Sequence, residues 1–293
     1  MIQVQGPTGL KTIALTAVAM LAFAGNSLIC RLALAGSAID AASFTGLRVL
    51  AGALTLAVVS AATARRRANR GRASGWAPAL ALFTYAALFS YAYLNLNAAT
   101  GALVLFGLVQ ATMLIAALLA GERPSRTVWT GWVIAVAGLV WLLLPGADAP
   151  SVTGALLMGV AGVAWGVYSL LGHGEPDALA ATTRNFVLAV IPAALLTLLA
   201  APGLSITATG AMLALLSGAV TSGLGYVIWY AALTGLTSAQ AALVQLSVPA
   251  IAAAGGVLLL AEPASARLVT SGALILGGIG LALAGGRRTG RVR

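Results

Sequence analysis

Long apolar segments separated by short polar connections follow one another along the whole chain. Ten of them have about the length of a membrane-spanning helix, which needs roughly 20 apolar residues. We place these spans at residues 12–34, 42–62, 75–94, 98–120, 127–144, 152–172, 180–200, 208–232, 239–260 and 267–286. A backbone inside hydrocarbon must satisfy its own hydrogen bonds, and continuous runs favour helices over the alternating strands of a membrane barrel. The pattern therefore predicts an all-α integral membrane protein with ten transmembrane helices.

The composition supports this prediction. Of the 293 residues, 60% are hydrophobic and 8% are charged, whereas about a quarter of a typical soluble chain is charged. No polar stretch is long enough to fold as a separate domain. Cys30 is the only cysteine and lies in an apolar run, which excludes a disulfide-stabilised scaffold. We therefore expect a lipid bilayer to surround most of the chain.

The charges are distributed asymmetrically between the connections. The net charge is +10, from 16 Lys and Arg and 6 Asp and Glu. No basic face interleaved with aromatics is present, so we expect no nucleic-acid partner. With the N-terminus in the cytoplasm, the basic clusters all fall on the cytoplasmic side, namely Arg65, Arg66, Arg67, Arg70, Arg72, Arg123, Arg126, Arg287, Arg288, Arg291 and Arg293. Positive charge on the inner side predicts a multi-pass protein of the cell inner membrane with both termini cytoplasmic.

Two halves of the chain repeat each other. The motif Ala-X-X-Ala-Leu-Val at 99–104 recurs at 239–244, and Glu122 and Glu262 are separated by the same 140 positions. Each half holds five spans, and an odd number reverses the second copy in the membrane. Residues 1–145 and 146–293 are therefore predicted to be inverted five-helix repeats that together form one transport domain. Such repeats are typical of secondary transporters, whose substrate site lies between the halves near the midplane.

Several short motifs resemble those of the drug/metabolite transporter superfamily, in particular its ten-helix EamA-type carriers. The motifs are Ala164-Trp165-Gly166, the span-start arginines Arg48 and Arg184, Pro249, and the glutamates in Gly121-Glu122-Arg123-Pro124 and Ala261-Glu262-Pro263. The run from Gln110 to Met113 and Trp132 are most similar to exporters of aromatic amino acids. The resemblance implies export of amino acids. Two positions depart from the family pattern: Val109 stands where the first half would match Pro249, and Ala24-Gly25-Asn26 replaces a Trp-Gly pair.

Polar side chains inside the spans are candidates for a substrate cavity. Each costs free energy in the membrane unless it is paired or faces a cavity. Asn26, Gln110 and Gln245 lie in the middle of their spans. Hydrogen bonding between helices is the alternative, and we prefer it for the Ser and Thr residues nearby. For the two glutamines, whose amides need several partners, both interpretations stand.

Aromatic residues form a second group of candidates. Tyr226 and Tyr230 lie on one helix face together with Ser222, and Tyr85 belongs to a similar stripe in the third span. Trp165 and Tyr168 lie too deep for the interfacial belt, so we expect them to line a cavity. Tryptophans near span ends are assigned to the interfacial belt, namely Trp76, Trp129, Trp132 and Trp141. For a second group, both the belt and a place in the cavity wall remain open, namely Tyr91, Tyr93, Trp229 and Tyr230.

Arginine and proline give further candidates, each with a structural alternative. Arg48 and Arg184 could attract a carboxylate-bearing solute into opposite vestibules, although a structural role is the preferred interpretation. Arg31 is expected to pair with Asp40 or to extend toward the headgroups. Pro249 removes a helix hydrogen bond and could serve as a gate hinge or only as a static kink.

No pattern indicates catalysis. No phosphate-binding glycine loop is present, and His173 has no metal-ligand spacing around it, so we expect neither an enzyme nor a metal or cofactor site. The sequence predicts a secondary transporter that exports amino acids, aromatic and other neutral ones, by alternating access without ATP. No acidic residue lies inside a span, which favours passive export over proton coupling. Efflux of cationic drugs or metabolites is the alternative, an enzyme or scaffold is a weaker one, and both a monomer and a homodimer remain open.

Overall fold

The chain folds into a bundle of helices in the computed structural model, which describes residues 9–64, 75–146, 149–173, 175–236 and 238–286. The first half contains α1 (Leu10–Ala35), α2 (Ala41–Ala64), α3 (Trp76–Ala92), α4 (Ala98–Leu119) and α5 (Arg126–Leu143). The second half contains α6 (Val152–Leu171), α7 (Ala178–Leu199), η1 (Ala201–Gly203), α8 (Ala208–Leu216), η2 (Ser217–Leu224), α9 (Gly225–Leu233), α10 (Ser238–Gln245), α11 (Ser247–Leu260) and α12 (Ala266–Gly286). The predicted all-helical membrane fold is confirmed, and each predicted span coincides with one helix or one run of helices.

Nine helical runs in the described part of the chain are long and apolar enough to cross a membrane, and α3 is slightly shorter, at 17 residues. Two of the spans are irregular. The span Ala208–Leu233 passes from α8 through the π-helix η2 into α9 without interruption. The ninth span is divided into α10 and α11. Both irregular spans lie in the second half.

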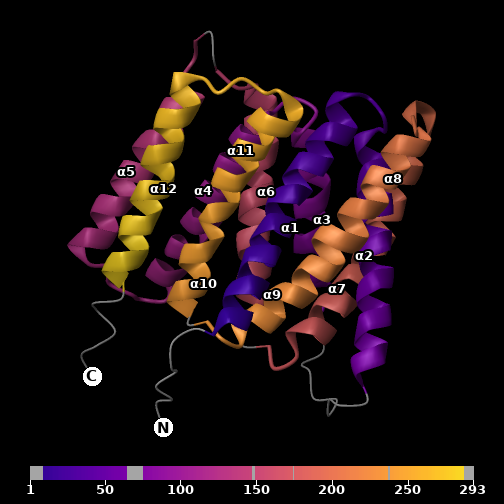
Figure 1. Cartoon of the computed structure of the whole chain (residues 1–293), viewed down its shortest axis with the longest axis horizontal. Helices are drawn as coiled ribbons and strands as arrows, with labels where there is room; N and C mark the ends of the chain where they lie inside the picture. The colour runs from indigo at the N-terminus through magenta and orange to yellow at the C-terminus, as the bar shows by residue number, and fades with distance from the viewer. Residues whose placement is uncertain (1–8, 65–74, 147–148, 174, 237, 287–293) are drawn as a thin grey trace.

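The helices stand side by side, with α5 and α12 at one edge and α2 and α8 at the other (Figure 1). The start of α1 and the end of α12 lie at the same end of the bundle, which we call the proximal end. The opposite end, which contains the connection between α1 and α2, is the distal end. The basic residues of 65–72 and 287–293 lie outside the described residues, as does Asp148, so the predicted membrane orientation stays a prediction.

Large apolar side chains cover much of the outside of the bundle. Leu119, Leu258 and Leu259 are each more than 70% exposed. A soluble protein rarely presents so much apolar surface, whereas lipid tails solvate it well. The interior is packed with small residues and aromatic rings, which lets helix backbones approach closely.

Glycines bring α5 and α12 into direct backbone contact. A Cβ atom at Gly278 would collide with backbone atoms of Gly131 and Ala135. Gly277, the neighbouring residue, points away from α5 and has no atom near its missing side chain. The packed face of α12 is therefore the one that carries Gly278.

The distal connections of the two halves are joined to each other. Ile39 and Ile206 form an antiparallel bridge, and the backbone N–H of Ser205 donates to Asp40 Oδ2 at 3.0 Å. Asp40 also caps α2, because its Oδ1 accepts from the backbone N–H of Ser43 at 2.8 Å. Partial burial opposes ionisation of Asp40, but hydrogen bonds from Ser43, Ser205 and Ala42 outweigh it and hold the pKa of Asp40 below its usual value.

Candidate functional site

A small central cavity lies where helices of the two halves meet. Its volume is about 40 Å³, which has room for water molecules but not for an amino acid. From the first half it is lined by Phe23, Asn26, Ser27, Tyr85, Phe89, Leu105 and Phe106, and from the second half by Trp165, Thr221, Ser222, Tyr226 and Gln245. Every side chain in this lining is apolar or neutral.

Trp165 of α6 is the centre of an aromatic cluster at this cavity. Its ring lies 4.8 Å from Tyr85, 5.3 Å from Tyr168 and 5.8 Å from Tyr226, measured between centroids. The pair with Tyr226 is stacked. Offset and stacked rings attract one another, so the cluster joins α3, α6 and α9 into one wall. Such a wall suits an apolar or aromatic group of a solute.

Tyr168 and Tyr230 lie behind the wall, toward the proximal end. The hydroxyl of Tyr168 donates to Thr182 Oγ1 at 3.4 Å, and Thr182 Oγ1 lies 2.5 Å from the hydroxyl of Tyr230. The two tyrosines are therefore linked through α7. They support the cluster but do not line the cavity.

Asn26 connects α1 with the π-helix η2. Its Oδ1 accepts hydrogen bonds from Ser217 Oγ at 2.7 Å and from Thr221 Oγ1 at 3.2 Å. All three residues are buried. π-helical segments are rare and frequently occur at functional sites. Here the segment places Thr221 and Ser222 side by side at the cavity wall.

The break between α10 and α11 lies beside the cavity. Gln245 ends α10, and its Nε2 donates to the carbonyl of Ala241 at 3.3 Å. Ser247 begins α11 and donates to the carbonyl of Val244 at 2.6 Å. Pro249 follows in the first turn of α11, where its missing N–H removes no helix bond. The break is thus next to the proposed hinge residue, while its role in gating stays a prediction.

Arg48 lies in the third turn of α2 and is only 3% exposed. Its Nη2 donates to the hydroxyl of Tyr85 at 3.2 Å, and the guanidinium lies 5.0 Å from the ring centre of Phe89. Its Nη1 has no partner in the described part of the chain. Arg184, the corresponding arginine of α7, interacts within the chain and does not line the central cavity. The two arginines therefore have different surroundings.

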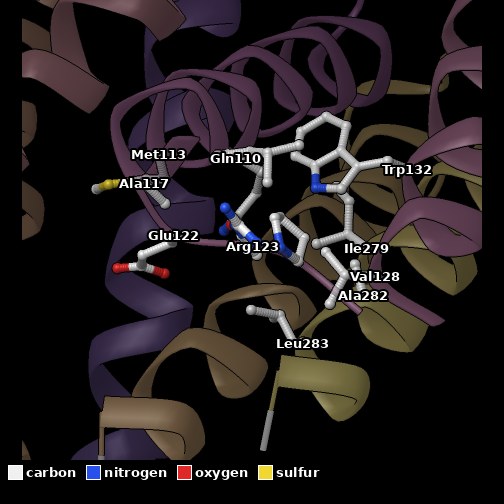
Figure 2. Close-up of a pocket in the computed structure, with 12 residues that line it drawn as sticks. Gln110, Met113, Ala117, Glu122, Arg123, Val128, Trp132, Ile279, Ala282 and Leu283 are labelled. Carbon is white, nitrogen blue, oxygen red and sulfur yellow. The ribbon is translucent and has the colours of Figure 1, made fainter. Parts of the chain in front are cut away.

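A larger cavity of about 560 Å³ lies at the proximal end, between α4, α5 and α12 (Figure 2). We call it the proximal groove. Gln110, Arg123 and Trp132 contribute to its lining, so Gln110 is separate from the central cluster. Gln110 nevertheless lies four residues after Phe106, on the same face of α4. The proximal groove therefore begins one helical turn from the central cavity.

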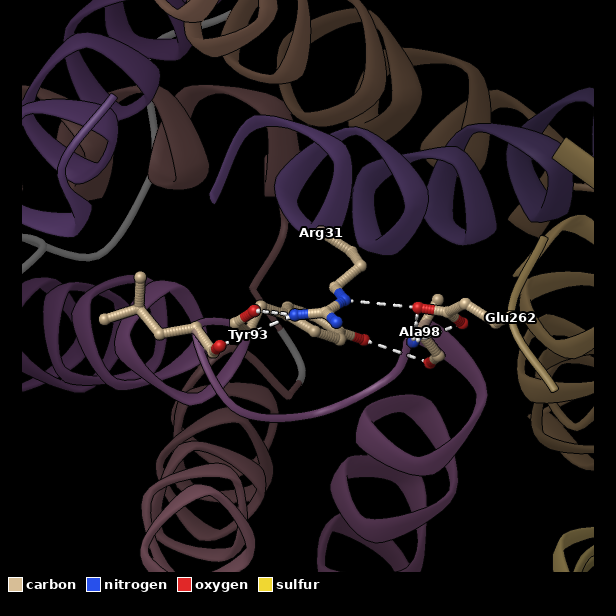
Figure 3. Close-up of polar contacts among 5 residues, drawn as sticks. Arg31, Tyr93, Ala98 and Glu262 are labelled. Atoms are coloured by element: carbon tan, nitrogen blue, oxygen red, sulfur yellow. Dashed lines mark hydrogen bonds and ion pairs between the residues drawn. The ribbon is translucent and has the colours of Figure 1, made fainter. Parts of the chain in front are cut away.

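A clasp of polar contacts joins four helix ends at the distal end (Figure 3). Arg31 of α1 forms an ion pair with Glu262 at 3.2 Å and donates to the carbonyl of Tyr93 at 2.9 Å. The carboxylate of Glu262 also accepts from the backbone N–H of Ala98, at the start of α4, at 2.9 Å. The expected pairing of Arg31 with Asp40 is wrong, because Glu262 supplies the carboxylate and Asp40 caps α2.

The structure brings six of the nine predicted substrate-binding residues together around the central cavity: Asn26, Tyr85, Trp165, Ser222, Tyr226 and Gln245. Sequence reasoning did not identify Thr182 and Thr221 as part of this region, because a threonine in a span carries no signal of the helix it faces. Tyr93 and Trp229 are buried inside the bundle. They therefore do not belong to the interfacial belt, whose side chains face the lipid headgroups.

Comparisons with known proteins identify relatives over nearly the whole chain. The EamA-like transporter family matches residues 152–284. An uncharacterized protein of Pseudomonas aeruginosa is 55% identical over 274 residues, which cover 94% of this chain and 95% of the relative. A crystal structure of another protein superposes with a TM-score of 0.65 at 20% identity, covering 96% of this chain and 98% of the other, and shows the shared fold.

Proposed function

We propose that the chain, whose residues 152–284 match the EamA-like transporter family, is a secondary transporter that exports amino acids, aromatic ones first, through the central cavity. The observation that carries the proposal is the aromatic wall around Trp165, built from helices of both halves. Rings offer an apolar contact surface, and the tyrosine hydroxyls add polar groups. In transporters built from inverted repeats the substrate site typically lies at such an interface between the halves, which supports the proposal.

The volume of the cavity supports alternating access. At about 40 Å³ the cavity cannot hold an amino acid, so the wall must separate before a solute enters. The proximal groove offers a route from the proximal end, since it begins one turn below Phe106 along α4. The clasp of Arg31 and Glu262 ties the distal end together in this conformation. We propose that transport opens the clasp and closes the proximal groove.

The predicted repeat relates Glu122 to Glu262 and points to a corresponding capping role for Glu122. Glu122 follows α4 at the proximal end, whereas Glu262 follows α11 at the distal end. Glu262 caps the start of α4, and the same shift of 140 residues relates Ala98 to Ser238, the first residue of α10. Glu122 is exposed and points away from Arg123 (Figure 2). We propose that it caps α10 when the proximal end closes.

The proposed energy source is the gradient of the solute itself. Within the described part of the chain, no helix contains Asp or Glu, and proton-coupled carriers commonly use an intramembrane carboxylate or histidine. Counterflow should then persist in vesicles without a pH gradient. An obligatory dependence on that gradient would reject passive export.

Efflux of cationic drugs is the second candidate, because aromatic rings also bind cations. No carboxylate lines the central cavity, and the buried guanidinium of Arg48 opposes a second positive charge nearby. A cationic dye therefore serves as the comparison solute in the transport assay.

Reconstitution in liposomes tests the proposal. Labelled Phe, Trp and Thr should exchange by counterflow, and the cationic dye should not. Trp165→Ala and Gln245→Ala should reduce the rate about tenfold, since 1.4 kcal/mol of lost interaction has that effect. Trp129→Ala, which alters a ring 47% exposed on the outside of α5, should leave the rate unchanged. Equal effects of all three substitutions, or exchange of the dye alone, would contradict the proposed site.

A further inference from the structure

Arg48 is a buried cation without an anionic partner. It lies seven residues into α2, about 10 Å from the distal start of that helix. Arginine stays protonated in proteins. In the described part of the chain, no carboxylate lies within ion-pair distance of its guanidinium, and Nη1 donates to no acceptor. The side chain thus retains both a positive charge and free hydrogen-bond donors inside the bundle.

The contacts that Arg48 does make lead to the central cavity. Its guanidinium lies 5.4 Å from the ring centre of Tyr85 and 5.0 Å from that of Phe89. Both rings line the cavity. Arg48 therefore lies directly behind the cavity wall formed by Tyr85 and Phe89. Its hydrogen bond to the Tyr85 hydroxyl directs the guanidinium toward residues that must move when the cavity expands. These cation–π contacts stabilise the charge only in part.

The remaining polar groups of the cavity do not offer a site for a positive charge. Asn26 Oδ1 already accepts from Ser217 and Thr221, and the lining includes no acidic side chain. Helix α11, the second part of the divided ninth span, begins two residues after Gln245. Its N-terminus, which carries the partial positive charge of the helix dipole, therefore lies near the cavity. The electrostatics of this region consequently favour an anionic group.

We propose that Arg48 binds the carboxylate of the transported solute, and that the central site recognises aromatic carboxylates with or without an amino group. This inference rests on the proposed function and narrows its substrate class. The ring of the solute would stack in the wall formed with Trp165, and its carboxylate would replace the Tyr85 hydroxyl as acceptor for Arg48. Aromatic amino acids supply both the ring and the carboxylate, and their ammonium group contributes little to the binding free energy.

Three ligands with the same phenyl ring distinguish the contribution of the carboxylate to binding from that of the ammonium group. L-phenylalanine carries both charges, 3-phenylpropionate only the carboxylate, and phenethylamine only the ammonium. Binding to the purified full-length protein in detergent is measured by titration calorimetry. We expect similar dissociation constants, within about threefold, for the two carboxylates. Phenethylamine should bind at least tenfold more weakly, because a hydrogen-bonded charge contributes that much or more.

Variants of two arginines supply the matched comparison. Arg48→Gln should weaken both carboxylates at least tenfold but should not weaken phenethylamine, because it also removes a positive charge that repels the ammonium. Arg48→Lys should retain part of the preference for carboxylates. Arg267→Gln is the control, because Arg267 also lies over an aromatic ring, that of Trp141, at the distal end of α12 and away from the cavity. Its dissociation constants should equal those of the wild type.

Phenethylamine binding as tight as that of phenylalanine would overturn the inference, as would undiminished carboxylate binding in Arg48→Gln. The ligand series on the wild type needs no substitution, so it decides the question even where Arg48→Gln does not fold. If liposomes exchange amino acids but phenylpropionate does not bind, the carboxylate inference fails and the proposed transport stands. If no solute is exchanged while both carboxylates bind, the proposed transport fails and Arg48 remains an anion site.

Discussion

At the scale of single residues, Asp40 shows how one carboxylate joins the two halves. It caps α2 and accepts from the backbone of Ser205. These hydrogen bonds hold the pKa of Asp40 below its usual value despite partial burial. The stabilisation is therefore complete above the unfolded pKa of about 3.9 and is lost as the pH falls through the lower folded pKa.

The comparison of Asp40→Asn with the wild type tests this linkage. The wild type should unfold at the higher temperature near neutral pH, because only the carboxylate accepts these bonds as an anion. The difference should stay constant down to about pH 5 and shrink below about pH 4. Thermal unfolding in detergent across this pH range measures it. A difference that grows on acidification would contradict the assignment.

Spacing alone predicted much of the central cluster but could not select partners across helices. Trp165 and Tyr168 were distinguished by their depth in a span, and Tyr226 by its distance of four residues from Ser222. The partner of Arg31 was not predictable, because Asp40 is close in sequence and Glu262 is 231 positions away. Gln110 and Gln245 looked alike in sequence, yet one lines the proximal groove and the other the central cavity.

At the scale of elements, the hydropathy pattern predicted the position of every span but not the irregularities within them. The π-helix η2 and the break after Gln245 depend on how neighbouring helices pack, for example on Asn26 accepting from Ser217 and Thr221. Pro249 marks the region of the break, although the break precedes it.

Two adjacent glycines of α12 allow a matched test of helix packing. Gly278→Ala should destabilise the protein by about 1–3 kcal/mol, because its Cβ atom would meet the backbone of α5. Gly277→Ala should be neutral or stabilising by up to about 1 kcal/mol, since its position is open and alanine favours helix. Denaturation of the two variants in the same detergent measures the difference. Equal effects would show that α5 and α12 do not pack through this face.

The clasp provides a second test at this scale. Glu262→Gln removes the ion pair with Arg31 and weakens the cap of α4, so stability should fall by about 1–2 kcal/mol. Glu122→Gln should leave the melting temperature of the same state unchanged, because Glu122 is exposed. If the two variants melt together, the clasp does not hold the distal end.

At the scale of the whole molecule, helices of the first and second halves surround one small cavity. The distal and proximal ends of the bundle are held by different contacts. The distal end is held by the clasp and by the bridge between Ile39 and Ile206. The proximal end contains the groove, which approaches the cavity along α4. We expect these ends to open in turn, so that a residue of the cavity becomes accessible from each side of the membrane.

Labelling of Ser222→Cys with a membrane-impermeant thiol reagent measures this most directly. The background is Cys30→Ser, which removes the only native cysteine. We expect modification when the reagent is added outside right-side-out vesicles and also when it is added outside inverted vesicles, with protection by phenylalanine in both. Glu262→Gln should accelerate labelling from the distal face alone. Modification from a single face, without protection by solute, would contradict alternating access.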